Sequence, residues 1–287
     1  MTLRPRRSAL YMPGANARAL DKARTLAADV LILDLEDAVA PDAKEQARAQ
    51  VLASVHEGGY GSRELVIRTN GLDTEWGHAD LAAAALSGAD AVLIPKVDSA
   101  EGVRLADRVL RAAGAPDSLR LWVMMETPRA MLAAGEIAGA SARLECLVMG
   151  TSDLTKDLNA LPTRDRLPMV TSLGLCLLAA RAYGLTALDG VHVDLDDADG
   201  LAASCRQGRE LGFDGKTLIH PKQLDAANTA FAPTSEEVAR ARRIIDAHAS
   251  AVAEGKGITL VDGKLVEALH VETARRVVAL GEVVGIS

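Results

Sequence analysis

Short apolar runs alternate with longer stretches of helical periodicity along most of the chain. The runs are nearly continuous in apolar residues, which is typical of strands that are covered on both faces of a parallel sheet. Helical patterns such as residues 99–114 and 171–184 lie between them. Eight runs can be recognised, at residues 8–12, 30–35, 64–69, 91–96, 121–126, 146–150, 188–193 and 216–220.

This alternation predicts right-handed βαβ units and therefore an α/β fold with a parallel sheet. Eight units within residues 1–230 indicate a (β/α)₈ TIM barrel, a fold of typically ~250 residues. A doubly wound sheet is the alternative. No GxGxxG motif follows the first run, which argues against the dinucleotide-binding version of that fold.

Residues 231–287 are more than a barrel needs and are expected to form a C-terminal helix-turn-helix extension. Thr234 and Glu237 form a capping box, which predicts that a helix starts there. Asp262-Gly263 indicates a small hairpin or loop, and a final helix is expected from about Leu265. The extension could be a lid, an oligomer arm or plain packing.

Composition and charge exclude several classes of function. The 287 residues carry a formal net charge of −7 and only 2% aromatic residues, which argues against a nucleic-acid partner. The three cysteines show no CxxC spacing and are expected to be buried thiols in a reducing compartment. No apolar run approaches the ~18 residues of a membrane span, so we expect no membrane partner and a cytoplasmic location.

Polar residues follow almost every predicted strand. Because the carboxyl ends of barrel strands meet at one rim, these residues are expected to surround one mouth. They are Asp34, Glu36, Asp37, Arg68, Asn70, Lys96, Glu126, Thr151, Ser152, Asp153, His192, Asp194, His220 and Pro221.

Glu126 and Asp153 are the best candidates for metal ligands. Two carboxylates from separate strand ends, completed by waters, describe a Mg²⁺ or Mn²⁺ site. Each carboxylate could instead cap the helix that follows it. Zinc is disfavoured because the six histidines show no HxxxH spacing.

Two cations of the predicted rim allow alternative roles. Arg68 is suited to clamp a substrate carboxylate or carbonyl, or to form a salt bridge with the acidic cluster at Asp34 to Asp37. Lys96 could be a Schiff-base lysine, or could form an ion pair with Glu126 or Asp37. Within the acidic cluster, Asp34 is expected to anchor the barrel interior or the neighbouring loop. Glu36 and Asp37 are expected to pair with Arg68 or Lys96.

Taken in order, these residues resemble the citrate lyase β-subunit / malyl-CoA lyase family. The resemblance spans the whole predicted barrel. The matching stretches are RSALYMPG, DLEDAVAPDAKEQAR, VIRTNGLDT, IPKVDSAEGV, METPRAM, VMGTSDLTKDL and GFDGKTLIHPKQ.

The resemblance implies a TIM barrel, usually a homotrimer or hexamer, with Mg²⁺ (or Mn²⁺) held by Glu126 and Asp153. Arg68 falls on the arginine that binds the carbonyl or enolate oxygen of the substrate. Glu36 and Asp37 fall on acidic residues that contact metal-bound water and support catalysis.

The resemblance also implies how a substrate is held. The backbone of Thr151, Ser152 and Asp153 would bind the substrate carboxylate, beside Arg68 and Glu126. Coenzyme A, as part of the substrate, would contact Tyr11, Lys22, Ile219, His220 and Pro221. Asn16 stands where some members of the family carry an arginine.

The C-terminal extension is similar to that of members that act on free CoA thioesters. Asp262 matches an aspartate in a DGK turn that reaches over the active site of a neighbouring subunit. There it serves as acid and base at the methyl group of acetyl-CoA. The local sequence by itself is that of an ordinary Asp-Gly hairpin turn.

These features predict a Mg²⁺-dependent carbon–carbon lyase. It would cleave a 3-hydroxyacyl-CoA ester, citramalyl-CoA or malyl-CoA, to acetyl-CoA and a 2-oxoacid by retro-Claisen chemistry. The alternatives are a citrate lyase β-subunit that acts on citryl-acyl-carrier protein, and an enzyme like malate synthase or malyl-CoA thioesterase. A non-enzymatic subunit that binds CoA esters is a further alternative from a different class.

Overall fold

The computed structural model describes residues 4–286, which separate into two compact units. The first unit comprises Arg6–Asn228, and the second begins at Thr229. The boundary lies within helix α10 (Leu224–Phe231).

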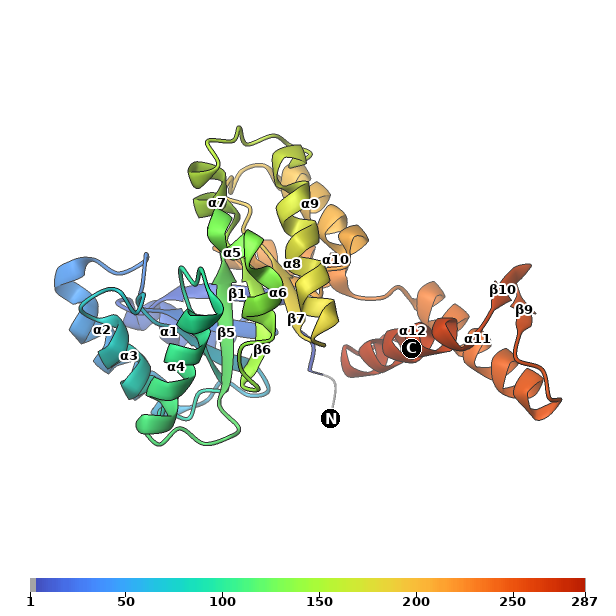
Figure 1. Ribbon diagram of the computed structural model, residues 1–287, viewed down its shortest axis with the longest axis horizontal. Helices are drawn as coiled ribbons and strands as arrows, with labels where there is room; N and C mark the ends of the chain where they lie inside the picture. The colour runs from blue at the N-terminus through green and yellow to red at the C-terminus, as the bar shows by residue number, and fades with distance from the viewer. Residues whose placement is uncertain (1–3, 287) are drawn as a thin grey trace. The chain divides into compact units, whose positions relative to one another are not determined.

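The first unit is a closed barrel of eight parallel strands, each paired with the next, and β1 pairs with β8 to close the ring (Figure 1). The prediction of a TIM barrel is therefore confirmed. The strands are β1 (Ser8–Pro13), β2 (Val30–Asp34), β3 (Glu64–Arg68), β4 (Ala91–Ile94), β5 (Arg120–Met125), β6 (Leu144–Met149), β7 (Thr186–Asp189) and β8 (Gly215–Leu218).

Helices connect the strands and cover the outside of the barrel (Figure 1). The α-helices are α1 (Ala17–Ala23), α2 (Lys44–Glu57), α3 (Gly77–Ala84), α4 (Ala100–Ala112), α5 (Pro128–Leu132), α6 (Ala134–Ala138), α7 (Thr151–Asp157), α8 (Val170–Ala182) and α9 (Ala198–Leu211). Short 3₁₀ turns are η1 (Pro41–Ala43), η2 (Leu167–Met169) and η3 (Pro221–Gln223).

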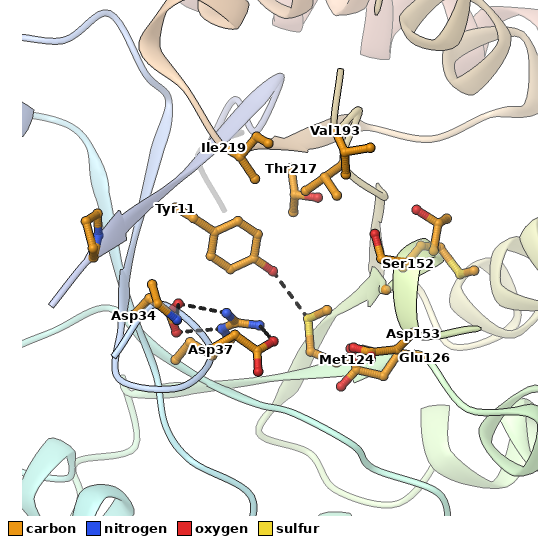
Figure 2. Close-up of a pocket in the computed structure, with 17 residues that line it drawn as sticks. Tyr11, Asp34, Asp37, Met124, Glu126, Ser152, Asp153, Val193, Thr217 and Ile219 are labelled. Carbon is orange, nitrogen blue, oxygen red and sulfur yellow. Dashed lines mark hydrogen bonds and ion pairs between the residues drawn. The ribbon is translucent and has the colours of Figure 1, made fainter. Parts of the chain in front are cut away.

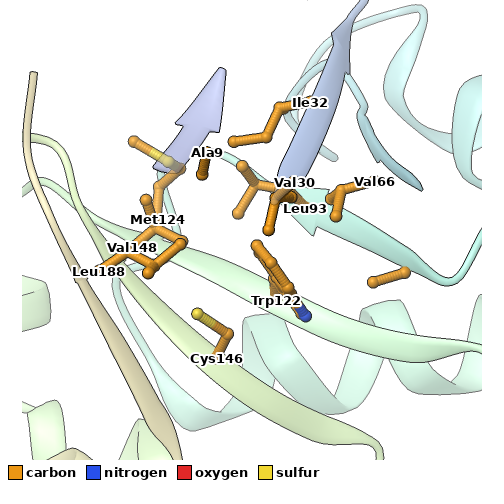
Figure 3. Close-up of a cluster of buried hydrophobic side chains, with 11 residues drawn as sticks. Ala9, Val30, Ile32, Val66, Leu93, Trp122, Met124, Cys146, Val148 and Leu188 are labelled. Carbon is orange, nitrogen blue, oxygen red and sulfur yellow. The ribbon is translucent and has the colours of Figure 1, made fainter. Parts of the chain in front are cut away.

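The barrel interior is filled by alternate residues of the strands, because successive side chains of a strand point to opposite faces (Figure 3). Trp122 of β5 is the largest side chain of this cluster and is fully buried. Its ring lies 4.9 Å from the guanidinium carbon of Arg6. The other members are Ala9, Val30, Ile32, Val66, Ala91, Leu93, Met124, Cys146, Val148 and Leu188.

Several strands end earlier than the apolar pattern predicts. β2 ends at Asp34, because the Asp34 carboxylate accepts hydrogen bonds from the amides of Glu36 and Ala38 and turns the chain out of the strand. β4 ends at Ile94, and Lys96 then adopts a left-handed backbone conformation with a φ of 52°. Glu36 and Lys96 therefore lie on loops of the rim and not in strands.

The second unit contains two helices and a hairpin: α11 (Ser235–Ala253), β9 (Thr259–Val261), β10 (Lys264–Val266) and α12 (Ala268–Val283). The capping box of Thr234 and Glu237 starts α11 as predicted. Asp262 and Gly263 have φ values of 51° and 73°, as a two-residue type I′ turn requires.

The final helix begins at Ala268, later than the predicted Leu265. Residues 264–266 instead form β10, in which Leu265 pairs with Leu260. Val261, Val266 and Val271 are buried together and form the small core of this unit.

Between residues 4 and 286, no helix is both long enough and apolar enough to cross a membrane.

Removal of the Trp122 ring should destabilise the barrel more than any change at its surface. We expect Trp122→Ala to lower the free energy of unfolding by about 3–5 kcal/mol, because the ring fills the interior. Urea denaturation at neutral pH measures this change. As a control, Leu178→Ala removes a side chain of α8 that is 72% exposed and should cost less than about 0.5 kcal/mol. Equal costs for the two variants would contradict this account of the core.

Candidate active site

A cavity of about 500 Å³ opens at the carboxyl ends of the barrel strands (Figure 2). All of its lining residues belong to the first unit. They are Tyr11, Pro13, Asp34, Asp37, Ala38, Arg68, Met124, Glu126, Met149, Gly150, Thr151, Ser152, Asp153, Val191, Val193, Thr217 and Ile219. The barrel therefore brings seven strand ends together around one space, as the sequence pattern predicts.

A buried ion pair joins the ends of β2 and β3 at this mouth. Arg68 donates from Nε and Nη2 to the two carboxylate oxygens of Asp34, at 2.7 Å each (Figure 2). Both side chains are nearly inaccessible to solvent. Asp34 is thereby fixed as an anchor between the two strand ends and is not free to bind a ligand.

The remaining face of the Arg68 guanidinium is directed at the rest of the acidic cluster. Nη1 lies 2.7 Å from Glu36 Oε2 and 3.7 Å from Asp37 Oδ2. The guanidinium carbon also stacks 4.7 Å from the centre of the Tyr11 ring. Asp37 is 64% exposed, so it is the member of the cluster most accessible to a ligand.

Lys96 contacts two carboxylates with different parts of the residue. Its ammonium pairs with Glu36, and its backbone N–H donates to Glu126 Oε1 at 2.6 Å. The predicted pairing of Glu36 with Arg68 or Lys96 is thus observed with both cations, and Lys96 pairs with Glu36 rather than with Glu126 or Asp37. Burial lowers the pKa of Lys96, but Glu36 and the other carboxylates outweigh burial and raise the pKa above its usual value. A persistently charged ammonium is a poor Schiff-base nucleophile.

Glu126 follows β5 and is almost fully buried. Burial, reinforced by the charges of Glu36 and Asp153, raises the pKa of Glu126 to about 7 against the opposing hydrogen bond from Lys96. Asp153 lies in the first turn of α7 and lines the same cavity. The two predicted metal ligands are therefore close enough for their charges to interact.

Gly150, between β6 and α7, permits this approach. A β-carbon at this position would lie 2.4 Å from both Cβ and Oε2 of Glu126. Any other residue would push Glu126 or the start of α7 away.

The Glu126–Asp153 pair fits a magnesium ion. Mg²⁺ prefers oxygen ligands, and it commonly uses one or two carboxylates and keeps several waters. The raised pKa of Glu126 indicates that its ionised form lacks a compensating positive charge, which a divalent ion would provide. Within residues 4–286, no cluster of three or more His, Cys, Asp or Glu side chains could hold a metal. The ion would thus depend on these two carboxylates, with water and substrate as the other ligands.

The residues implied as coenzyme A contacts divide into two groups. Tyr11 and Ile219 line the cavity. Lys22 is exposed on α1, and His220 is exposed where it caps η3 with Nδ1. Pro221 begins η3, beside the cavity wall at Ile219. Their contact with coenzyme A stays a prediction.

Asp262 lies in the hairpin turn of the second unit. Its Oδ2 accepts a hydrogen bond from Arg243 at 3.0 Å, and Arg240 Nε lies 3.8 Å away. The side chain is about half exposed. Its predicted role at an active site stays a prediction.

The charged residues of the mouth were found from the sequence, but most of its apolar wall was missed. Met124, Met149, Val191 and Val193 form this wall between the charged groups, and the polar Thr217, which was also missed, lines the cavity beside them. Strand alternation could have indicated Met124, because it lies two residues before Glu126 and Trp122 lies two before Met124.

The fold and the carboxylate-lined mouth define a barrel protein of the type that carries its active site at the carboxyl ends of the strands. Residues 7–221 match the family described as HpcH/HpaI aldolase/citrate lyase, and the chain belongs to this family of enzymes.

Similar proteins carry two kinds of name. The chain is 53% identical to a (3S)-malyl-CoA thioesterase of Cereibacter sphaeroides over 98% of this chain and 96% of the relative. It is 37% identical to citrate lyase subunit beta of Escherichia coli over 99% of this chain and 95% of the relative.

Among solved structures, protein CitE from Mycobacterium tuberculosis, in complex with magnesium, acetoacetate and coenzyme A, is similar with a TM-score of 0.75 and 30% identity. That match covers 97% of this chain and 99% of the CitE chain. Binding of magnesium and coenzyme A within this family is thereby supported.

Gly150→Ala should damage the carboxylate pair without damaging the barrel. The added methyl group would displace Glu126, so we expect Mn²⁺ affinity to fall about 10–100-fold, as for other residues that support metal ligands. Electron paramagnetic resonance titration with Mn²⁺ measures the affinity. Gly135→Ala in α6 is the matched control, because its β-carbon would meet nothing within 4 Å. An unchanged Mn²⁺ affinity in Gly150→Ala would contradict the assignment.

The stability of the metal-free protein should depend on pH through Glu126. In the folded protein the pKa of Glu126 is about 7, whereas the usual pKa of a glutamate side chain is 4.5. The folded state thus binds more protons between these values, and the free energy of unfolding decreases as pH rises through them.

Glu126→Gln removes this dependence. In EDTA we expect the variant to exceed the wild type in stability by about 1–3 kcal/mol at pH 8, with a difference that narrows towards pH 5. Urea denaturation at several pH values measures the difference. A difference that does not change with pH would show that Glu126 ionises normally.

Proposed function

We propose that this protein hydrolyses the thioester of a 3-hydroxy dicarboxylic acyl-CoA, with (3S)-malyl-CoA as the first substrate to test. The observation that carries the proposal is the 53% identity to a (3S)-malyl-CoA thioesterase across 98% of the chain. The cavity supports it, because it combines an acidic pair for a metal with a guanidinium and an apolar wall.

The hydroxyacid end of the substrate would enter the mouth first. Magnesium on Glu126 and Asp153 would supply Lewis-acid polarisation and a fixed orientation for this end. The backbone at Thr151 and Ser152 would hold the distal carboxylate. Arg68, already fixed by Asp34, would face the thioester carbonyl and stabilise the negative charge that develops on its oxygen.

Asp37 is suited to activate the water. It lines the cavity, it is more exposed than Glu36, and only a 3.7 Å contact joins it to Arg68. As general base it would take a proton from water while the water oxygen attacks the thioester carbon. The carbon–sulfur bond then breaks, and the thiolate of coenzyme A leaves and takes up a proton. The products are malate and free coenzyme A.

Coenzyme A would leave the mouth between β1 and β8. Tyr11 and Ile219 form this part of the cavity wall. Lys22, His220 and Pro221 would continue the contact outside the cavity, and Lys22 would offer its charge to a phosphate.

Carbon–carbon cleavage is the second candidate function. It is favoured by the similarity to citrate lyase subunit beta and by the position of Arg68, which could equally stabilise an enolate. Cleavage of malyl-CoA or citramalyl-CoA would leave the enolate of acetyl-CoA, which needs a proton on carbon. Asp262 of a neighbouring copy in a homotrimer or hexamer would donate that proton.

Product analysis separates the two candidates. We expect purified protein with (3S)-malyl-CoA and Mg²⁺ to release free thiol and malate, and to lose this activity in EDTA. Mass spectrometry of the CoA species measures the outcome. Acetyl-CoA with glyoxylate, or with pyruvate from citramalyl-CoA, would instead assign the lyase. The absence of turnover with either ester under any metal condition would overturn both.

Asp262→Asn tests the same distinction from the second unit. Hydrolysis protonates no carbon atom, so we expect its rate to change less than about threefold in this variant. A loss of 10²-fold or more would favour the lyase, because general acid–base groups contribute about 10²–10⁴-fold. Asp246→Asn, on exposed α11 surface, is the matched control.

A further inference from the structure

We infer that Lys44 is a positioning residue that holds the loop of Glu36 and Asp37 in its active geometry. The inference rests on the proposed function only for its kinetic consequence. Its structural basis is independent of the substrate.

Lys44 lies behind the acidic loop, at the first position of α2, and is only 6% exposed. Its ammonium donates to the carbonyl oxygens of Leu35 at 2.9 Å and Glu36 at 2.7 Å. These two carbonyls follow directly after the end of β2. Lys44 thus binds the backbone of the loop, and the Glu36 carboxylate pairs with Arg68 and Lys96 instead.

The carbonyls of Leu35 and Glu36 are no longer paired in the sheet, and Leu35 is 1% exposed, so donors from the protein must replace water there. Asn70 Nδ2 also donates to Leu35 O, at 2.9 Å, while Glu36 O has the Val39 amide as its other donor. Lys44 is the donor that bonds to both carbonyls and so fixes the peptide between them.

Lys44 also supplies positive charge under the acidic cluster. Burial lowers the pKa of Lys44 below its usual value, although Asp34, Glu36, Asp80 and Asp37 act in the opposite direction. In its charged form the ammonium reduces the repulsion among these carboxylates. The indole ring of Trp76, 5.5 Å from the ammonium, covers its other side.

The hydrogen bonds of Lys44 to the loop affect the reacting groups through the position of Glu36. With the loop fixed, Glu36 meets Arg68 at 2.7 Å and pairs with Lys96. Without it, the peptide at 35–36 could rotate and Glu36 would leave both cations. Asp37, the next residue, would move with it.

Lys44→Met tests this role, because it keeps the length of the side chain and removes the donors and the charge. We expect kcat to fall about 10–100-fold and KM for the acyl-CoA to change less than about threefold. In a crystal structure of the variant, Glu36 should have left Arg68 and Lys96. If Lys44→Met does not fold, Lys44→Gln retains an N–H donor without charge and should give a smaller effect in the same direction.

Arg143→Met is the matched control for general destabilisation. Arg143 is a 5% exposed cation that also donates to backbone carbonyls. Its acceptors are Pro116 O at 2.6 Å, Leu119 O at 3.0 Å and Ala115 O at 3.3 Å, before β5 at the opposite end of the barrel. We expect it to lower the melting temperature and to leave kcat and the position of Glu36 unchanged. Equal falls of kcat in the two variants would overturn the inference.

A spectroscopic measurement is independent of turnover. Trp76 and the fully buried Trp122 are the two tryptophans, so Lys44→Met should shift the Trp76 emission, and the shift should vanish in Trp76→Phe. If the wild type hydrolyses no malyl-CoA, the proposed function fails, while the emission and the crystal structure still decide the role of Lys44. Retention of Glu36 on Arg68 and Lys96 in Lys44→Met would overturn it.

Discussion

The mouth of this barrel depends on the neutralisation of carboxylates that lie close together. Asp34, Asp37 and Glu126 line one cavity, and Glu36 lies beside it in contact with the cations Arg68 and Lys96. A buried ion pair is stable only where its geometry is good, and removal of one partner leaves an uncompensated charge. The bidentate contact of Arg68 with Asp34 meets this condition. This contact fixes the orientation of the Arg68 guanidinium, so that its Nη1 atom stays directed at Glu36 and Asp37.

The same requirement explains why the charge of Glu126 remains incompletely compensated. The fixed cations contact Asp34 and Glu36, so the charge of Glu126 is opposed mainly by the single amide of Lys96. A site that is short of positive charge at Glu126 and offers Asp153 as a second oxygen donor is suited to a divalent ion from solution.

Hydrophobic periodicity was sufficient to predict the eight strands, the closed barrel and the rim on which the charged residues meet. Strand ends were predicted less well, because an apolar residue beyond a strand, such as Leu35, gives the same signal as one inside it. The turn after Asp34 arises from side-chain hydrogen bonds to the loop amides, which no pattern of polarity records. The start of α12 was missed for a similar reason, because residues 264–266 satisfy both a strand and a helix pattern.

Within the site, sequence order predicted which charged residues meet, and it predicted that Glu36 pairs with Arg68 or Lys96, but it left open which cation contacts which carboxylate. The sequence left Arg68 as either a substrate clamp or a salt-bridge partner, and Lys96 as either a Schiff-base lysine or an ion-pair partner. The choice between these roles depends on the conformations of short loops. Lys44 was not identified at all. On a helix rich in charged residues a lysine is expected to face water, and only the fold shows that this one points into the protein.

Lys96 links Glu36, which follows β2, to Glu126, which follows β5. Its ammonium forms an ion pair with Glu36, and its backbone N–H donates a hydrogen bond to Glu126. The N–H points towards Glu126 because the φ angle of Lys96 is 52°. The residues best suited to that backbone conformation are glycine and asparagine, neither of which carries an ammonium. Replacement of Lys96 by glycine would therefore keep the backbone hydrogen bond to Glu126 and abolish the ion pair with Glu36. A side chain that replaces the ammonium beside Glu36 must therefore also adopt the backbone conformation in which the amide of residue 96 reaches Glu126.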